Sequence, residues 1–76
     1  MHKDVEEILE LIWTFKEKKK TAKREEIIKA SKVENTGLFL DEMLKDKYIE
    51  ESGGIITLTP SGDKTGESVV RRLRLA

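Results

Sequence analysis

The sequence contains no cysteine, so it can form neither a disulfide framework nor a thiolate metal cage. Its one histidine, His2, stands next to the N-terminus, which leaves no serine–histidine–aspartate set for nucleophilic catalysis. No glycine-rich phosphate loop follows a predicted strand, and 76 residues offer little concave volume. These absences predict a protein that is not an enzyme and that takes no small-molecule substrate.

Long apolar runs are missing as well. No stretch reaches the ~18 apolar residues that a transmembrane helix needs. The first residues are acidic, whereas a secretory signal would be basic and then apolar. Together with the lack of cysteine, this pattern predicts a cytoplasmic protein with no membrane partner.

Basic and acidic residues cancel to a net charge of zero, but they are segregated along the chain. This segregation creates two local basic patches. Basic patches suit a polyanion, but these two are explained equally well as solvated helix ends and a loop. The sequence leaves both interpretations open. The first patch comprises Lys16, Lys18, Lys19, Lys20, Lys23 and Arg24, and the second Arg71, Arg72 and Arg74.

Helical periodicity predicts a first helix over about Asp4–Lys18. Leu11 and Trp13 fall outside its apolar stripe, so more than half of the circumference is apolar. Either the last helix covers this second face, or a second copy of the chain does, with Trp13 at the interface. The stripe itself consists of Val5, Ile8, Leu9, Ile12 and Phe15.

Two further helices follow at the spacing of a helix-turn-helix. Thr21 is the expected N-cap of a helix over about Ala22–Ser31. After a short turn plugged by Val33, Asn35 is expected to cap a third helix that runs to about Lys47.

Alternating apolar residues predict a β-hairpin, or wing, over about Ile49–Thr59. Gly53 and Gly54 supply the positive φ angles that its turn needs. Thr59 is a predicted N-cap, and Pro60 fits the first position of a fourth helix. That helix reaches the last residue without a stop signal, which favours a piece of a longer protein.

The fold prediction is mainly α with a small β-hairpin (α+β). We expect a single winged helix-turn-helix domain over residues 1–76, with a three-helix core, a wing and a C-terminal linker helix. The predicted core consists of Ile8, Leu9, Ile12, Phe15, Ile27, Ala30, Leu40, Leu44, Ile49, Ile56, Leu58 and Val69.

Four segments carry a resemblance to a known family: residues 5–13, 42–51, 58–62 (Leu-Thr-Pro-Ser-Gly) and 69–76 (Val-Val-Arg-Arg-Leu-Arg-Leu-Ala). Together they resemble the N-terminal winged-helix domain of the diphtheria-toxin-repressor family of iron- and manganese-dependent repressors. The resemblance implies that a full-length parent is a dimeric, metal-activated repressor whose dimerisation domain follows this one.

By the same resemblance, Glu7 and Glu10 occupy the first-helix positions of a manganese-type site. A family histidine on the linker helix falls at Leu73, which cannot bind metal. Two carboxylates one turn apart suit a hard divalent ion, but they also suit an ordinary helix start. We therefore expect no cofactor in this chain, and iron or manganese only in a full-length parent.

The function predicted is that of a DNA-binding transcriptional regulator, with double-stranded DNA and a second copy of the chain as partners. The recognition helix would be about Asn35–Lys47, although its outward Asp41 and Glu42 repel phosphates. The alternative is a protein–protein interaction domain that uses this acidic face or the apolar surplus of the first helix. The predicted DNA-binding residues are Lys23, Arg24, Lys32, Asn35, Thr36, Leu38 and Lys45.

Overall fold

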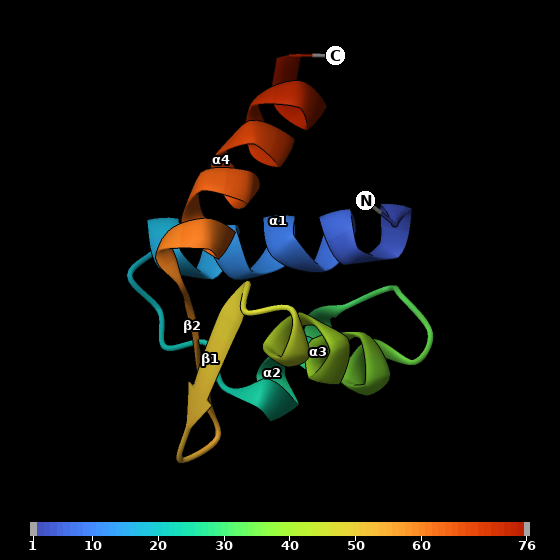
Figure 1. Ribbon diagram of the computed structural model, residues 1–76, viewed down its shortest axis with the longest axis vertical. Helices are drawn as coiled ribbons and strands as arrows, with labels where there is room; N and C mark the ends of the chain where they lie inside the picture. Colours follow the sequence, from blue (N-terminus) through green and yellow to red (C-terminus); the bar gives the residue numbers. More distant parts are fainter. Residues whose placement is uncertain (1, 76) are drawn as a thin grey trace.

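The computed structural model describes residues 2–75, which form four helices with a two-stranded antiparallel hairpin between the third and fourth (Figure 1). This is the arrangement of a winged helix-turn-helix, as the sequence predicts. The elements are α1 (Lys3–Glu17), α2 (Arg24–Ala30), α3 (Thr36–Lys45), β1 (Ile49–Ser52), β2 (Ile55–Leu58) and α4 (Pro60–Leu75).

The core lies between α1, the α2–α3 pair and the hairpin. Apolar side chains on one stripe of α1 meet Ile27 of α2 and Leu40 of α3, and all of these are removed from water. Phe15, Leu44 and Leu58 pack against this cluster but stay partly exposed. The fully buried side chains are Ile8, Leu9, Ile27, Leu40, Met43 and Ile49.

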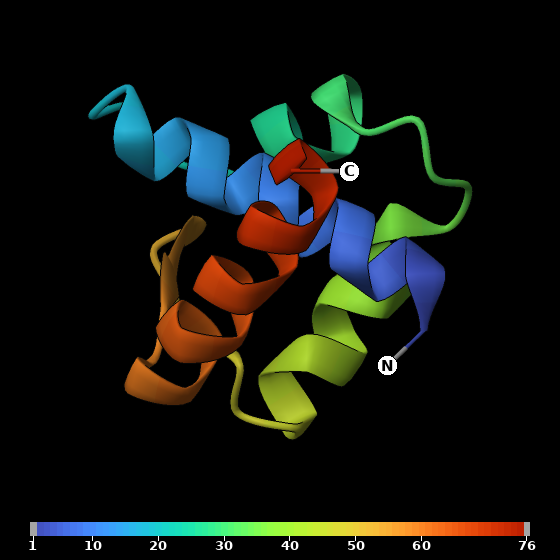
Figure 2. The same ribbon diagram turned by 90° about the horizontal axis from the view of Figure 1, so that it is seen from above.

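The second apolar face of α1 is covered by α4, which crosses it in both views of the ribbon (Figures 1 and 2). Val69 and Val70 of α4 are buried. Gly66 lets the two helices approach closely, because a Cβ at this position would lie 3.2 Å from Cε3 of Trp13. Of the two explanations for the apolar surplus of α1, the structure therefore shows packing within the chain.

The hairpin has the register that its alternating residues predict, with Ile49 opposite Leu58 and Glu51 opposite Ile56. Gly53 and Gly54 adopt φ angles of 57° and 78° at the turn. The α1–α2 loop extends this small sheet. The Ile56 N–H donates to the Ala22 carbonyl at 2.8 Å, and an isolated bridge joins Lys23 to Ile55.

The joint between β2 and α4 depends on Thr59, whose predicted role as N-cap is confirmed. Its Oγ1 accepts the Gly62 N–H at 3.0 Å, and its hydroxyl donates to the Lys47 carbonyl at 2.6 Å. Glycine is required at position 62, because a Cβ there would lie 1.8 Å from the Tyr48 carbonyl oxygen. The Leu-Thr-Pro-Ser-Gly motif is thus a tight junction between wing and helix.

Both α1 and α3 end in a Schellman motif that places a lysine, not a glycine, in the left-handed region. Lys19 has a φ of 55°, and the Lys20 N–H donates to the Phe15 carbonyl at 2.9 Å. Lys47 has a φ of 63° after α3. These motifs fix the direction in which the chain leaves each helix.

Three details of the sequence prediction are wrong. α2 begins at Arg24, and Lys23 replaces Thr21 as its N-cap residue, because residues 22–23 pair with the hairpin. Asn35 stands at the N-cap of α3 but is left-handed and makes no side-chain capping bond. Ala30, expected in the core, is exposed, because α2 ends there and only Ile27 of this helix is buried.

Candidate nucleic-acid interface

The turn between α2 and α3 is held by hydroxyl groups. Thr36 is 3% exposed, and its hydroxyl donates to the Val33 carbonyl at 2.7 Å. The Ser31 Oγ accepts the Val33 N–H at 3.0 Å and lies 2.7 Å from Thr36 Oγ1. Thr36 therefore fixes the angle between the two helices, and its hydroxyl does not face a partner.

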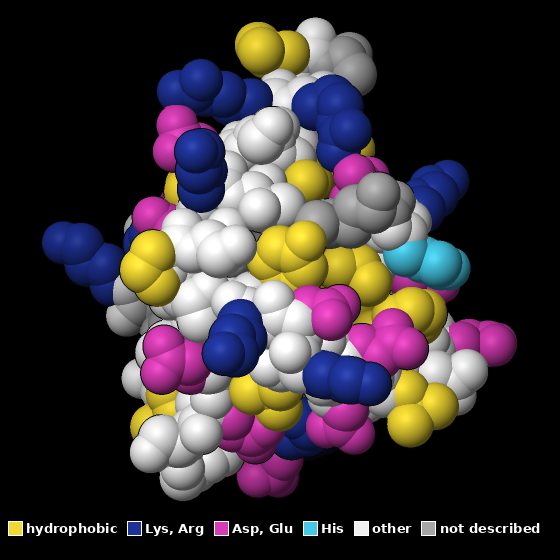
Figure 3. Space-filling view, in the orientation of Figure 1, with side chains coloured by type: hydrophobic (Ala, Val, Ile, Leu, Met, Phe, Trp, Pro, Cys, Tyr) yellow, Lys and Arg dark blue, Asp and Glu magenta, His cyan; other side chains and the backbone are white. Residues whose placement is uncertain are grey.

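The outward face of α3, defined here by Leu38, Asp41, Glu42 and Lys45, stands clear of the core. Leu38 is 65% exposed although it is apolar, and the other three side chains are exposed as well. Figure 3 shows acidic side chains gathered over the half of the molecule that holds α3 and the hairpin, with basic groups among them. This surface is of mixed charge and not strongly basic.

Arg24, predicted to bind phosphate, is instead the centre of a network within the domain. Its guanidinium donates to Glu51 of β1 at 2.9 Å, to Asp41 of α3 at 2.5 Å and to the Gly37 carbonyl at 3.1 Å. One side chain of α2 thus connects the start of α3 with the wing. It also neutralises two carboxylates that would otherwise face a polyanion.

Glu51 is a partner of Arg24 that the predicted site residues do not include. It follows Ile49 by two residues, so both side chains share the inward face of β1. Its side chain is 22% exposed. A carboxylate on an inward face needs a charged partner, and this alternation was the available signal.

Three of the predicted DNA-binding residues are exposed lysines: Lys23 at the N-cap of α2, Lys32 in the turn and Lys45 near the end of α3. None of them forms an ion pair within residues 2–75. Asn35, also exposed, lies at the start of α3. Lys32 and Asn35 thus lie before or at the start of α3, Lys45 lies near its end, and Lys23 lies at the start of α2.

The lysine block that follows α1 is placed elsewhere. Lys18, Lys19 and Lys20 belong to the loop at the far end of α1 from α3 in both ribbon views (Figures 1 and 2). The second basic patch, on α4, is partly neutralised, since Arg72 pairs with Glu6 and Arg74 with Glu17. The basic residues of the sequence therefore do not form one continuous surface.

The candidate metal ligands Glu7 and Glu10 lie on α1. Among residues 2–75, no three histidine, aspartate or glutamate side chains come close enough together to hold a metal ion. Leu73, at the position of the family histidine, is on α4 and 44% exposed. His2 is the N-cap residue of α1, where its Nδ1 accepts the Asp4 N–H at 3.1 Å.

Comparison of the chain with models of protein families, with curated proteins and with solved structures found no match. The resemblance to the metal-dependent repressors therefore stays a prediction from the sequence. Within the described residues, none of the helices has both the length and the apolar character needed to cross a membrane.

Proposed function

We propose that this domain is the DNA-binding part of a transcriptional regulator and that it sets α3 into the major groove of duplex DNA. The observation that carries the proposal is the α2–turn–α3 unit followed by a wing, in which α3 presents an outward face unused by the core. On this face Leu38 would contact a thymine methyl group, and Asp41 or Glu42 would accept from cytosine N4.

Phosphate contacts would come from both ends of α3. Lys32 and Asn35 lie at its start, Lys45 near its end, and Lys23 at the start of α2. Such contacts position the protein on the duplex, and the base contacts specify the sequence. Arg24 supports them indirectly, because it neutralises Asp41 and Glu51 and fixes α3 against the wing.

Binding as a homodimer is part of the proposal. The last turn of α4 exposes Leu75, which is 84% accessible. A second copy that covers Leu75 would bring two α3 helices to one duplex, as helix-turn-helix dimers do. A divalent metal belongs only to a full-length parent in this proposal.

The test is fluorescence anisotropy with a labelled random duplex over a range of salt concentrations. Binding should weaken linearly on a log–log plot, with a slope of about −0.9 per phosphate contact. The double variant Lys23→Gln/Lys45→Gln should bind more weakly and flatten that slope by about 2. Lys64→Gln on α4, which removes an exposed lysine without an ion pair within residues 2–75, is the matched control.

A second candidate is a protein–protein interaction domain, favoured by the carboxylates of the outward face. Asp41 and Glu42 accompany the exposed Leu38, and Arg24 and Thr36 are engaged inside the domain. An acidic surface around an apolar side chain suits a basic protein partner. No binding to duplex at micromolar protein and low salt, by a folded sample, would favour this candidate over the first.

A further inference from the structure

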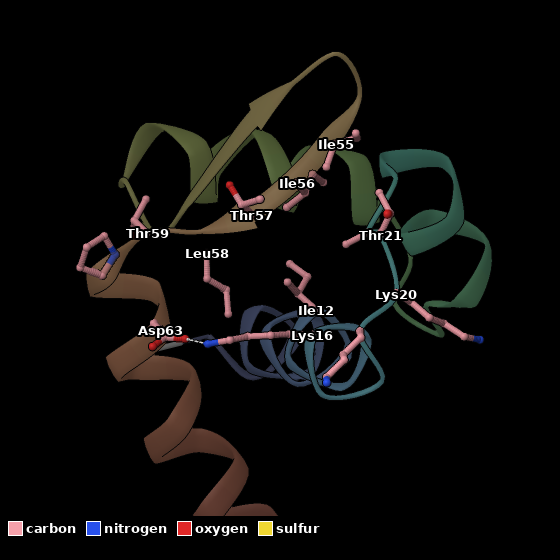
Figure 4. A pocket seen from close by; sticks show the side chains of 13 residues that line it. Ile12, Lys16, Lys20, Thr21, Ile55, Ile56, Thr57, Leu58, Thr59 and Asp63 are labelled. Carbon is pink, nitrogen blue, oxygen red and sulfur yellow. Dashed lines mark hydrogen bonds and ion pairs between the residues drawn. The ribbon is translucent and has the colours of Figure 1, made fainter.

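A groove of about 730 Å³ runs along β2, between the C-terminal half of α1, residues 19–22 and the start of α4 (Figure 4). We call it the β2 groove and define it by Leu58, its partly exposed apolar residue, and by its basic rim (Lys19 and Lys20). Ile12 and Ile56 lie beneath Leu58 and are only 2% exposed. In Figure 4, Ile56 and Leu58 point toward Ile12 across the groove. None of the seven predicted DNA-binding residues lines it.

The edge of β2 is open inside this groove. The Thr59 N–H donates to Tyr48, on the β1 side, whereas the Ile56 N–H donates away from β1 to Ala22. Because the hydrogen-bonding side alternates along a strand, the N–H and C=O of Leu58 also point away from β1. No backbone group of the described chain bonds them there, since residues 22–24 pair with the hairpin only at residues 54–56.

Positive charge lines the rim of the groove. Lys19 and Lys20 are exposed and pair with no carboxylate within residues 2–75, whereas Lys16 pairs with Asp63 (Figure 4). The Schellman motif after α1 fixes the backbone that carries both rim lysines. The partly exposed Leu58, its unpaired backbone groups and Lys19 therefore line one groove, and Lys20 extends outward at its edge in Figure 4.

We propose that the β2 groove binds an acidic segment of a partner protein in extended conformation, which adds a third strand to the hairpin at Leu58. Main-chain hydrogen bonds would supply affinity, and alternate side chains specificity. An apolar residue of the segment would cover Leu58, and acidic residues would meet Lys19 and, at the outer edge of the rim, Lys20. The proposal is independent of DNA binding by α3.

A nucleic acid fits this site less well than a peptide. A phosphodiester backbone has no N–H group to donate to the Leu58 carbonyl, and it would leave the Leu58 side chain uncovered. An exposed strand edge pairs readily with another peptide strand. The charge of the rim selects acidic over basic segments.

The test uses a capped eight-residue peptide of alternating valine and glutamate, titrated into ¹⁵N-labelled protein and followed by amide chemical shifts. The shifts should concentrate at Ile56, Leu58 and the 19–22 loop. A peptide of alternating valine and lysine should not bind. An alternating valine–glutamate peptide with N-methylated amides on its bonding edge should lose most of its affinity, because it cannot donate to Leu58.

Variants of the rim test the charge contribution. Lys19→Gly/Lys20→Gln should weaken peptide binding roughly fivefold, and the glycine suits the left-handed backbone at position 19, so folding is retained. Lys45→Gln, on the outward face of α3, should leave peptide affinity unchanged. The amide spectrum of each variant verifies that it is folded.

Three results of the peptide titrations would overturn the proposal. They are no shift at millimolar peptide with folded protein, equal binding by the N-methylated peptide, and shifts that map away from β2. A parallel titration with random duplex tests the other polyanion. If Lys19→Gly/Lys20→Gln weakens duplex binding as much as Lys23→Gln/Lys45→Gln does, the rim serves nucleic acid and the peptide proposal fails.

Discussion

The outward face of α3 and the β2 groove differ in how far the domain has already satisfied their polar groups. On the outward face of α3, Asp41 is bound by Arg24, and the polar groups left open are the side chains of Glu42 and Lys45. In the β2 groove, the backbone groups of Leu58 and the ammonium groups of Lys19 and Lys20 have no such partners within residues 2–75. A helix satisfies its own backbone and offers only side chains, whereas a strand edge also offers its backbone. The two surfaces therefore suit partners of different chemistry.

The largest expected effect is on stability, and it should differ between the buried and the outward side of α3. Leu40→Ala should lower the free energy of unfolding by about 2–5 kcal/mol, because Leu40 is 0% exposed. Leu38→Ala, two residues earlier and 65% exposed, should stay within about 0.5 kcal/mol of the parent. Urea denaturation measures both, and a similar loss in both variants would show that α3 has no free outward face.

The second prediction concerns the joint that both surfaces share. Gly62→Ala should cost about 3 kcal/mol, the upper end of the range for overpacking, because its Cβ would meet the Tyr48 carbonyl oxygen. The clash is with backbone, which cannot swing aside as a side chain does. Both the exit of α3 and the end of the β2 groove should be disturbed in the amide spectrum.

Gly37→Ala is the matched control. Its Cβ would lie 3.8 Å from Ile28 Cδ1, an ordinary contact, and α3 should gain about 0.5–1 kcal/mol from the loss of a helical glycine. If both alanine variants unfold at the urea concentration of the parent, close approach at position 62 is not what selects glycine.

These contrasts also show how much of the fold can be predicted from the sequence. Periodicity, the Gly-Gly turn, and Thr59 followed by Pro60 are local signals, and they predicted all four helices and the hairpin. Ala30 and Thr36 were misplaced because helical spacing does not reveal where a helix of seven residues meets the core, nor which hydroxyl closes the turn. Neither error changes the fold.

The surfaces were harder to predict than the elements. From the sequence alone, Arg24 is predicted to contact phosphate. In the structure, its guanidinium pairs with Asp41 and Glu51, which come from two other elements. The β2 groove is assembled from α1, the following loop, β2 and α4, and its open edge depends on where that loop stops pairing. Such features follow from tertiary arrangement, which spacing along the chain does not encode.

The third prediction is a substitution that should weaken duplex binding by the outward face of α3 and leave peptide binding in the β2 groove unchanged. Arg24→Met leaves Asp41 and Glu51 without their cation, and it should cost about 1 kcal/mol, because the exposure of Asp41 reduces the value of that pair. Duplex affinity at low salt should fall, since two carboxylates are uncovered, whereas valine–glutamate peptide affinity should stay unchanged.

A double-mutant cycle of Arg24→Met with Glu51→Gln isolates the pair from other effects. Positive coupling in urea denaturation would support the network as the connection between α3 and the wing. Additive losses would mean that Arg24 stabilises the domain only through the packing of its aliphatic stem.

The smallest expected effect lies away from both surfaces, where the end of α4 meets the end of α1. Two hydrogen bonds from Arg74, at 2.9 and 2.7 Å, lower the pKa of Glu17 below its ordinary value. Because the folded-state pKa is the lower one, this pair stabilises the fold above the pKa of Glu17 in the unfolded chain. That stabilisation is lost as the pH falls through the folded-state pKa.

The thermal midpoint of Glu17→Gln should therefore lie slightly below that of the parent at pH 7, and the gap should close toward pH 3. Arg74→Gln should follow the same course, because either change removes the ion pair and its two-pronged hydrogen bonding. A gap that stays constant from pH 7 to pH 3 would contradict the assignment. Since neither residue contributes to the outward face of α3 or to the β2 groove, duplex and peptide affinities at pH 7 should match the parent. A change in either affinity would mean that the α1–α4 contact positions that surface, and the two surfaces would then not be independent.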